Sequence, residues 1–152
     1  MISSKVNFSF DNSIESITLS KSNLLQPGIC IFIIDSSLIV SINYRNTNYL
    51  FMGDSQNNRI KDYLSEHSDK EYDFIKIPYH GNYQKRLDDL LETTNPKYVV
   101  ITCSATEPDI TETIELLDEL NIKYYLTKNG SITIKSDGEN NVILKCKIDI
   151  EF

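Results

Sequence analysis

Two side chains that could bind a metal ion stand directly after two strand-like runs of this sequence. Asp54 ends the run YLFMGD, and His80 stands in DFIKIPYHGN. Open α/β sheets place their ligands at the carboxyl ends of strands, so both residues are expected at one edge of a sheet. The chain has two histidines in total, and a metal site built from it alone would therefore have few ligands.

Each of these residues also has a structural interpretation, and the sequence leaves both open. Asp54 could cap the helix predicted after it with its carboxylate, or it could form a turn before that helix. His80 could be a loop histidine that is bonded to the backbone in a tight turn beside Gly81. The other histidine, His67, falls near the end of the helix predicted after Asp54, on its apolar stripe, which favours a packed side chain over a ligand.

The cysteines predict buried thiols. Cys30, Cys103 and Cys146 are far apart, lie in apolar runs and form no Cys-x-x-Cys motif. Free buried thiols are typical of proteins in a reducing compartment. A nucleophile at Cys103 or Ser104 would need a histidine base, for which His80 is the candidate, and we regard this dyad as the weaker alternative.

Composition predicts one soluble domain over residues 1–152, of which residues 1–28 are the hardest to assign. The formal charge of −7 and the pI of about 4.8 disfavour nucleic-acid binding, because no basic cluster offsets them. The N-terminus has no signal-peptide pattern, and the longest apolar run, residues 29–34, is far shorter than the ~20 residues that a membrane helix needs. We therefore expect a cytoplasmic protein with no membrane partner.

Apolar periodicity predicts an α/β protein with a mixed sheet and helices packed on one face. Helical spacing predicts helices over residues 57–67 and 84–93, and a third that starts at Pro108. In the half-buried strand predicted at 38–44, the inward residues are expected to be Leu38, Val40, Ile42 and Tyr44. The predicted strands cover residues 6–10, 29–34, 38–44, 49–52, 73–78, 98–103, 122–126, 131–135 and 142–150.

The order and spacing of four segments within about residues 35–138 indicate a known fold. These segments are DSSLIVSINYRNTNYLFMGD, DFIKIPYHGN, NPKYVVITCSA and IKYYLTKNGSITIKSDG. Together they resemble the C-terminal half of the metallo-β-lactamase fold. The resemblance is closest to the branch that contains the hydrolase domain of DNA-uptake (competence) proteins and the phosphorylcholine esterases. It implies half of a four-layered αββα sandwich over residues 29–152. It also implies that Asp54 bridges two metal ions and that His80 binds the second metal.

The chain departs from that family where most metal ligands should stand. The family's His-x-His-x-Asp-His cluster does not occur, and its His-His-Gly stands here as Tyr79-His80-Gly81. A catalytic zinc needs about three protein ligands and an open position, and a two-metal site needs more. The chain is therefore expected not to catalyse alone, and to bind Zn²⁺ or Mn²⁺ only if other ligands complete the site.

Three functional hypotheses follow from this ligand count. The first is a degenerate scaffold that acts as a binding or regulatory module. The second is the C-terminal part of a metal-dependent hydrolase of phosphoesters or related esters, completed by a missing N-terminal half or a partner chain. The third is a self-associating half-domain that buries its sheet face in a homodimer. The sequence favours the absence of catalysis by this chain alone.

Overall fold

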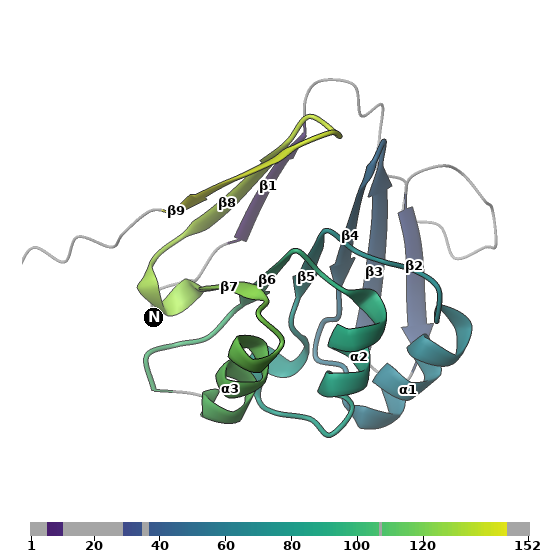
Figure 1. Ribbon diagram of the computed structural model, residues 1–152, viewed down its shortest axis with the longest axis vertical. Coiled ribbons are helices and arrows are strands. Elements are labelled where there is room, and N and C mark those ends of the chain that lie inside the picture. The colour runs from purple at the N-terminus through teal and green to yellow at the C-terminus, as the bar shows by residue number, and fades with distance from the viewer. Residues whose placement is uncertain (1–5, 11–28, 35–36, 107, 146–152) are drawn as a thin grey trace, which may run out of the picture.

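A computed structural model describes residues 6–10, 29–34, 37–106 and 108–145, and gives the backbone alone for the strands at 6–10, 29–34 and 141–145 (Figure 1). The strands are β1 (Val6–Phe10), β2 (Ile29–Ile34), β3 (Ser37–Tyr44), β4 (Thr47–Phe51), β5 (Phe74–Lys76), β6 (Tyr98–Ile101), β7 (Lys123–Leu126), β8 (Ile132–Ser136) and β9 (Asn141–Lys145). The helices are α1 (Asn57–Glu66), α2 (Leu87–Thr94) and α3 (Thr111–Glu119), with 3₁₀ turns η1 (Pro78–Gly81) and η2 (Thr127–Asn129).

The strands form two sheets. The larger sheet has six strands in the order β2-β3-β4-β5-β6-β7, antiparallel from β2 to β4 and parallel from β4 to β7. The smaller sheet has the order β1-β8-β9, in which β1 runs parallel to β8. Figure 1 shows the helices on one face of the larger sheet and the smaller sheet on its other face. The predicted α/β fold with a mixed sheet and helices on one face is confirmed.

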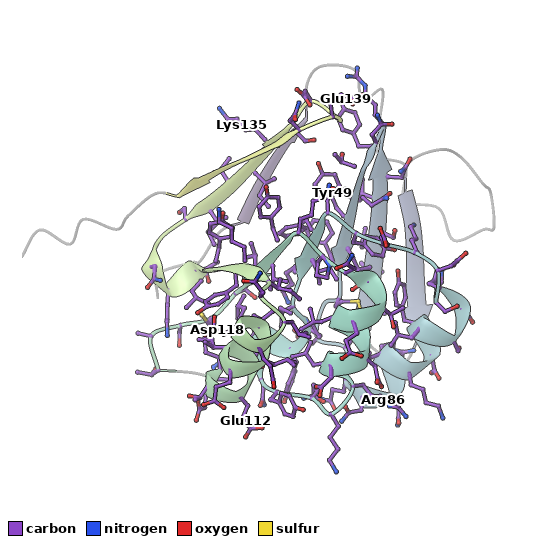
Figure 2. All side chains as sticks on the ribbon, viewed as in Figure 1. Tyr49, Arg86, Glu112, Asp118, Lys135 and Glu139 are labelled. Carbon is purple, nitrogen blue, oxygen red and sulfur yellow. The ribbon has the colours of Figure 1, made fainter. Side chains whose placement is uncertain are left out.

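Two buried clusters separate these layers. The cluster under the helices joins apolar helix stripes to alternate residues of the large sheet, as helical and strand periodicity require. The cluster between the sheets is rich in aromatic residues. Tyr49 lies there, fully buried, and burial raises the pKa of its hydroxyl while nearby hydroxyls of Ser136 and Thr47 partly oppose the rise (Figure 2). The buried members of the cluster between the sheets are Tyr44, Tyr49, Phe74, Val100, Tyr125, Ile132 and Ile134.

Strand β3 mostly buries the opposite side from the one predicted. Ile39 and Ser41 are 1% and 2% exposed, whereas Leu38 is 46% exposed and only Tyr44 of the predicted inward set is buried. The Ser41 hydroxyl has a partner at 2.9 Å in the Tyr72 hydroxyl, so this buried polar group is satisfied. The prediction was wrong because a serine with a buried partner takes an inward position that the apolar pattern does not reveal.

Two helices begin later than predicted. Helix α2 begins at Leu87 rather than residue 84, and α3 begins at Thr111, so Pro108 lies before the helix and not in its first turn. The Asp109 carboxylate accepts hydrogen bonds from the N–H and the hydroxyl of Thr111, at 3.0 and 2.7 Å. Such side-chain bonding to nearby backbone competes with the helix. The bonds from Thr111 also lower the pKa of Asp109.

The remaining predicted elements match the structure within a few residues. Strand β9 confirms the last predicted strand as far as Lys145, and the rest of that prediction lies outside the described residues, as does the thiol of Cys146. The side chain of Cys30 is likewise not described, whereas Cys103 is a buried free thiol, as predicted. In the part of the chain that the structure describes, no helix has the length and apolar character that a membrane span requires.

Two hairpin turns hold the sheets together at one end. Arg45, in the turn between β3 and β4, donates from Nη1 to the Asp137 carbonyl at 2.7 Å. The Asn46 N–H donates to the Gly138 carbonyl at 3.0 Å. Gly138 has φ +87°, and a Cβ there would lie 2.5 Å from Arg45 Cδ. A side chain at position 138 would therefore strain the backbone and push the two turns apart.

We predict that Gly138→Ala lowers the free energy of unfolding by about 1–2 kcal/mol, because the left-handed conformation penalises a Cβ and the Arg45 side chain must move. Urea unfolding followed by circular dichroism measures this change. Glu139→Ala is the matched control in the same turn, and we expect a loss below about 0.5 kcal/mol because its contact with Asn46 is exposed. Equal losses in the two variants would contradict the role assigned to Gly138.

Candidate functional site

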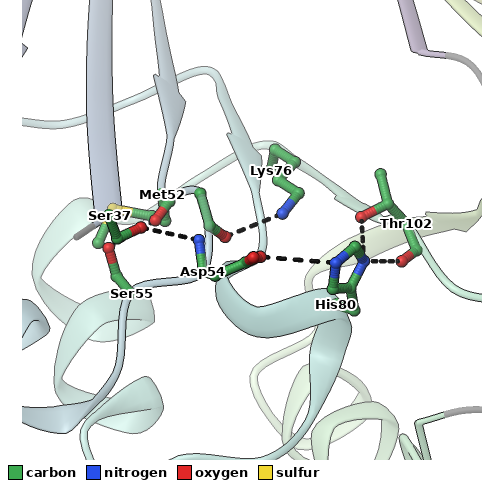
Figure 3. A network of polar contacts seen from close by, with 8 residues as sticks. Ser37, Met52, Asp54, Ser55, Lys76, His80 and Thr102 are labelled. Carbon is green, nitrogen blue, oxygen red and sulfur yellow. Dashed lines mark hydrogen bonds and ion pairs between the residues drawn. The ribbon is translucent and has the colours of Figure 1, made fainter.

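The ends of three neighbouring parallel strands meet at one edge of the larger sheet. Strands β4, β5 and β6 lie side by side, and the segments that follow them carry Asp54, His80 and Thr102 (Figure 3). Asp54 Oδ1 lies 3.5 Å from His80 Nε2. The two residues singled out by the sequence are therefore brought together at the strand edge. Metal binding by them remains a prediction.

The Asp54 loop is fixed through its backbone, which leaves the carboxylate exposed. The Asp54 N–H donates to the Ser37 hydroxyl at 2.9 Å. The preceding Gly53 has φ +57°, and a Cβ there would lie 2.7 Å from both the Leu38 carbonyl oxygen and Ser37 Oγ. Helix α1 has Gln56 at its N-cap and no side-chain cap, so the interpretation of Asp54 as a helix cap is wrong. Its interpretation as a turn residue is confirmed, because Gly53 and Asp54 form a turn. Its carboxylate is 63% exposed and faces His80.

His80 lies in a left-handed turn. Tyr79, His80 and Gly81 have φ values of 49°, 56° and 85°, a conformation that costs free energy for the two residues with side chains. The turn packs closely against β6, since a Cβ on Gly81 would lie only 2.5 Å from Ile101 Cγ2. The hydroxyl of Thr113 in α3 also donates to the Gly81 carbonyl at 2.7 Å. The turn is therefore held against β6 and α3, and it presents the histidine ring outward.

Hydrogen bonding fixes the orientation of the His80 ring. Nδ1 lies 2.8 Å from the Thr102 carbonyl oxygen, and because that oxygen only accepts, Nδ1 carries the hydrogen. In a neutral ring the lone pair of Nε2 then points toward the Asp54 carboxylate. Their separation of 3.5 Å exceeds the usual 2.7–3.2 Å of an N–H···O bond. His80 is thus bonded to the backbone, as its interpretation as a loop histidine predicted. It also faces the Asp54 carboxylate, as its interpretation as a metal ligand would require.

Lys76 is a third charged group at this edge, and sequence reasoning did not single it out. Its Nζ donates to the Gly53 carbonyl at 2.9 Å. Burial lowers the pKa of Lys76, and the nearby Asp54 carboxylate partly opposes this shift. Lys76 ends β5 four residues before His80 (Figure 3), and this position at a strand end was the signal that could have identified it.

The described residues offer no further cluster of metal ligands. Among them, no group of three or more His, Cys, Asp or Glu side chains is placed to hold a metal ion. His67 stacks on Tyr63 with ring centroids 4.5 Å apart, as the packed interpretation predicted. Cys103 is 4% exposed, and the His80 nitrogens face Thr102 and Asp54. The geometry therefore does not support a Cys103–His80 dyad.

Comparison with known proteins gives no relative for this chain. No family model, curated protein or solved structure matches it. The resemblance to the metallo-β-lactamase fold accordingly stays a prediction, and the arguments about this site rest on its own geometry.

We predict that Lys76 loses its proton at lower pH than Lys97 in an NMR titration of the lysine side chains. Burial lowers the pKa of Lys76, whereas the hydrogen bond and charge of Asp73 raise that of Lys97. Because folded Lys76 binds its proton less tightly than the unfolded chain does, its titration favours folding as pH rises from its folded pKa toward its ordinary value.

The variant Asp54→Ala tests the cause of this shift. Removing the carboxylate should lower the pKa of Lys76 further, because Asp54 raises it, and should leave Lys97 unchanged. Lys97 therefore serves as the reference within each sample. Coincident titration of Lys76 and Lys97 would show that Lys76 is hydrated and not part of the site.

Proposed function

We propose that this chain is a binding module on a metallo-β-lactamase-like scaffold that lacks most metal ligands and does not catalyse hydrolysis alone. One observation carries the proposal. Asp54 and His80 face each other at 3.5 Å at the strand edge, without a third His, Cys, Asp or Glu ligand among the described residues. Such a pair can contact a cation weakly but cannot complete a catalytic centre.

The separation of the pair supports its role as two ligands of one cation. Two ligands bound at about 2.0–2.2 Å to a tetrahedral zinc lie roughly 3.4 Å apart. The Asp54–His80 distance of 3.5 Å is close to this value and longer than a hydrogen bond. The bond from Nδ1 to the Thr102 carbonyl is also the arrangement by which metal-binding histidines commonly fix their ring and tautomer.

The number of ligands argues against catalysis by the chain alone. A catalytic zinc is held by about three protein ligands and keeps a position for water or substrate. The described residues supply two, and the ammonium of Lys76 beside them adds positive charge that opposes a second cation. We infer that the pair alone binds Zn²⁺ or Mn²⁺ only weakly and without activation of water, and that useful affinity requires further ligands.

A second candidate is the C-terminal part of a metal-dependent hydrolase of phosphoesters or related esters. The exposure of the pair favours it, since His80 and Asp54 are 54% and 63% exposed at the same edge. Ligands from a missing N-terminal half or from a complementing chain could therefore reach a cation between them. The layers of helices, large sheet and small sheet are also consistent with half of an αββα sandwich.

A cytoplasmic location belongs to the same proposal. The buried free thiol of Cys103 suits a reducing compartment.

The formal charge of −7 argues against nucleic acid as the partner. We therefore propose a protein partner, either a second copy of this chain or a complementing chain.

We predict that Zn²⁺ or Mn²⁺ raises the melting temperature only at concentrations far above those of the protein. At ten times the dissociation constant, mass action stabilises the native state by ~1.4 kcal/mol, which is a rise of roughly 3–6 °C. Asp54→Ala and His80→Ala should each abolish the rise, measured by differential scanning fluorimetry. Asp62→Ala removes an exposed carboxylate of α1 and is the matched control.

Two outcomes would contradict the proposal. A rise of the same size in Asp54→Ala and in the unmodified chain would place metal binding elsewhere. Tightly held, stoichiometric zinc in the purified chain, together with turnover of an ester without any added protein, would show that the chain is a complete hydrolase. Ester turnover that appears only on mixing with a second chain would favour the second candidate.

A further inference from the structure

Strand β7 is an outer strand of the larger sheet in the part of the chain that the structure describes. It pairs with β6 on one side, and no other described strand pairs with it (Figure 1). An edge strand exposes a row of backbone N–H and C=O groups that can bond to another strand. This edge lies two strands away from β5 and the segment that carries His80.

Hollows flank this edge on both faces of the sheet. One, of about 350 Å³, is lined by residues that include Leu117 of α3 and Tyr124. The other, of about 200 Å³, is lined by residues that include Tyr125 and Ile132 of β8. An added strand would direct alternate side chains to the two faces, and hollows on both faces suit such a strand.

We infer that β7 pairs in antiparallel fashion with β7 of a second copy of this chain, with Tyr124 opposite Tyr124. A two-fold axis perpendicular to the sheet keeps the helices of both copies on the same face. Residues directly opposite across two strands also share a face. Position 124 of one copy can therefore face position 124 or 126 of the other copy, but not 125. In the 124–124 register, Lys123 lies opposite Tyr125, and Ile122 lies opposite Leu126.

Side-chain chemistry favours this register. Lys123 Nζ already lies 5.8 Å from the Tyr125 ring centroid within one chain, so the ammonium and the ring are placed for a cation–π contact that the pairing repeats between copies. Ile122 and Leu126 are both partly buried against the helix-side cluster and would extend it across the interface.

The strip along β7 carries no acidic charge that would oppose a second copy as the occupant. Each chain carries a formal charge of −7, so most pairs of surfaces on two copies repel each other. The strip from residue 122 to 126 reads IKYYL and contains no acidic residue. Burial raises the pKa of the Tyr124 hydroxyl, and the nearby Asp118 carboxylate adds to this rise (Asp118 is labelled in Figure 2). Two acidic chains can thus meet along β7 without opposing carboxylates on the strand.

Sedimentation equilibrium of the full chain over a wide range of concentrations tests the inference. We expect a dimer, twice the mass of one chain, that dissociates on dilution. Tyr124→Lys and Tyr124→Glu should each be monomeric, because each places two like charges opposite each other. An equimolar mixture of the two should form a heterodimer, since opposite charges then face each other across the axis.

The matched control is Leu38→Lys, which places a charge on the exposed apolar residue of β3. This variant should dimerise like the unmodified chain. A monomer at all concentrations would overturn the inference. So would a dimer that Leu38→Lys dissociates and Tyr124→Lys does not, because the sheet face would then be the interface.

A second measurement avoids charged substitutions and decides the matter if either charged variant fails to fold. Tyr124→Cys should form an intermolecular disulfide under mild oxidation, because position 124 faces itself across the axis. Leu126→Cys faces position 122 and should give no more cross-linked dimer than the unmodified chain. Cross-linking of Leu126→Cys in preference to Tyr124→Cys would overturn the proposed register.

Discussion

The hydrogen bonds that join the ends of β4, β5 and β6 are the constraint on which the candidate site depends. Met52 N–H donates to the Lys76 carbonyl, and Ile77 N–H donates to the Val100 carbonyl, at 3.4 and 3.0 Å. The Tyr79 N–H then donates back to the Gly53 carbonyl at 3.1 Å. These bonds tie the loop after each strand to its neighbour. The position of Asp54 relative to His80 is therefore a property of the sheet rather than of two independent loops.

The same carbonyl of Gly53 also accepts a hydrogen bond from Lys76 Nζ, and this contact links the end of β5 to the Asp54 loop through a side chain. The ammonium supplies a positive charge near the Asp54 carboxylate. The imidazole of His80 faces the same carboxylate, with Nε2 at 3.5 Å from Oδ1. Asp54 therefore has two basic side chains near it, and both come from the strand ends that also position the carboxylate.

Much of the fold could be predicted from the sequence, because the apolar spacing of the helices and the β-branched strands report directly on burial. The meeting of Asp54 and His80 was also predictable, since parallel strands share a carboxyl edge. Other features were not accessible. The burial of Ser41 depends on Tyr72, 31 residues away, and the pairing of β1 with β8 depends on segments at opposite ends of the sequence. The bond from Lys76 to the Gly53 carbonyl depends on the path of that loop, which periodicity does not encode, although the position of Lys76 at a strand end could have identified it as part of the site.

The pairing of β1 with β8 has a consequence for how the molecule forms. Val6 lies opposite Ile132, so this strand has its partner 126 residues further along the chain. Bringing such distant segments together is slow, because the loop entropy is lost before the contact is gained. The layer of helices and the large sheet can form first, while β1 stays unpaired until β8 is available. Until β8 is in place, the aromatic face of the large sheet is not covered by the small sheet, and exposed apolar surface of this kind promotes aggregation.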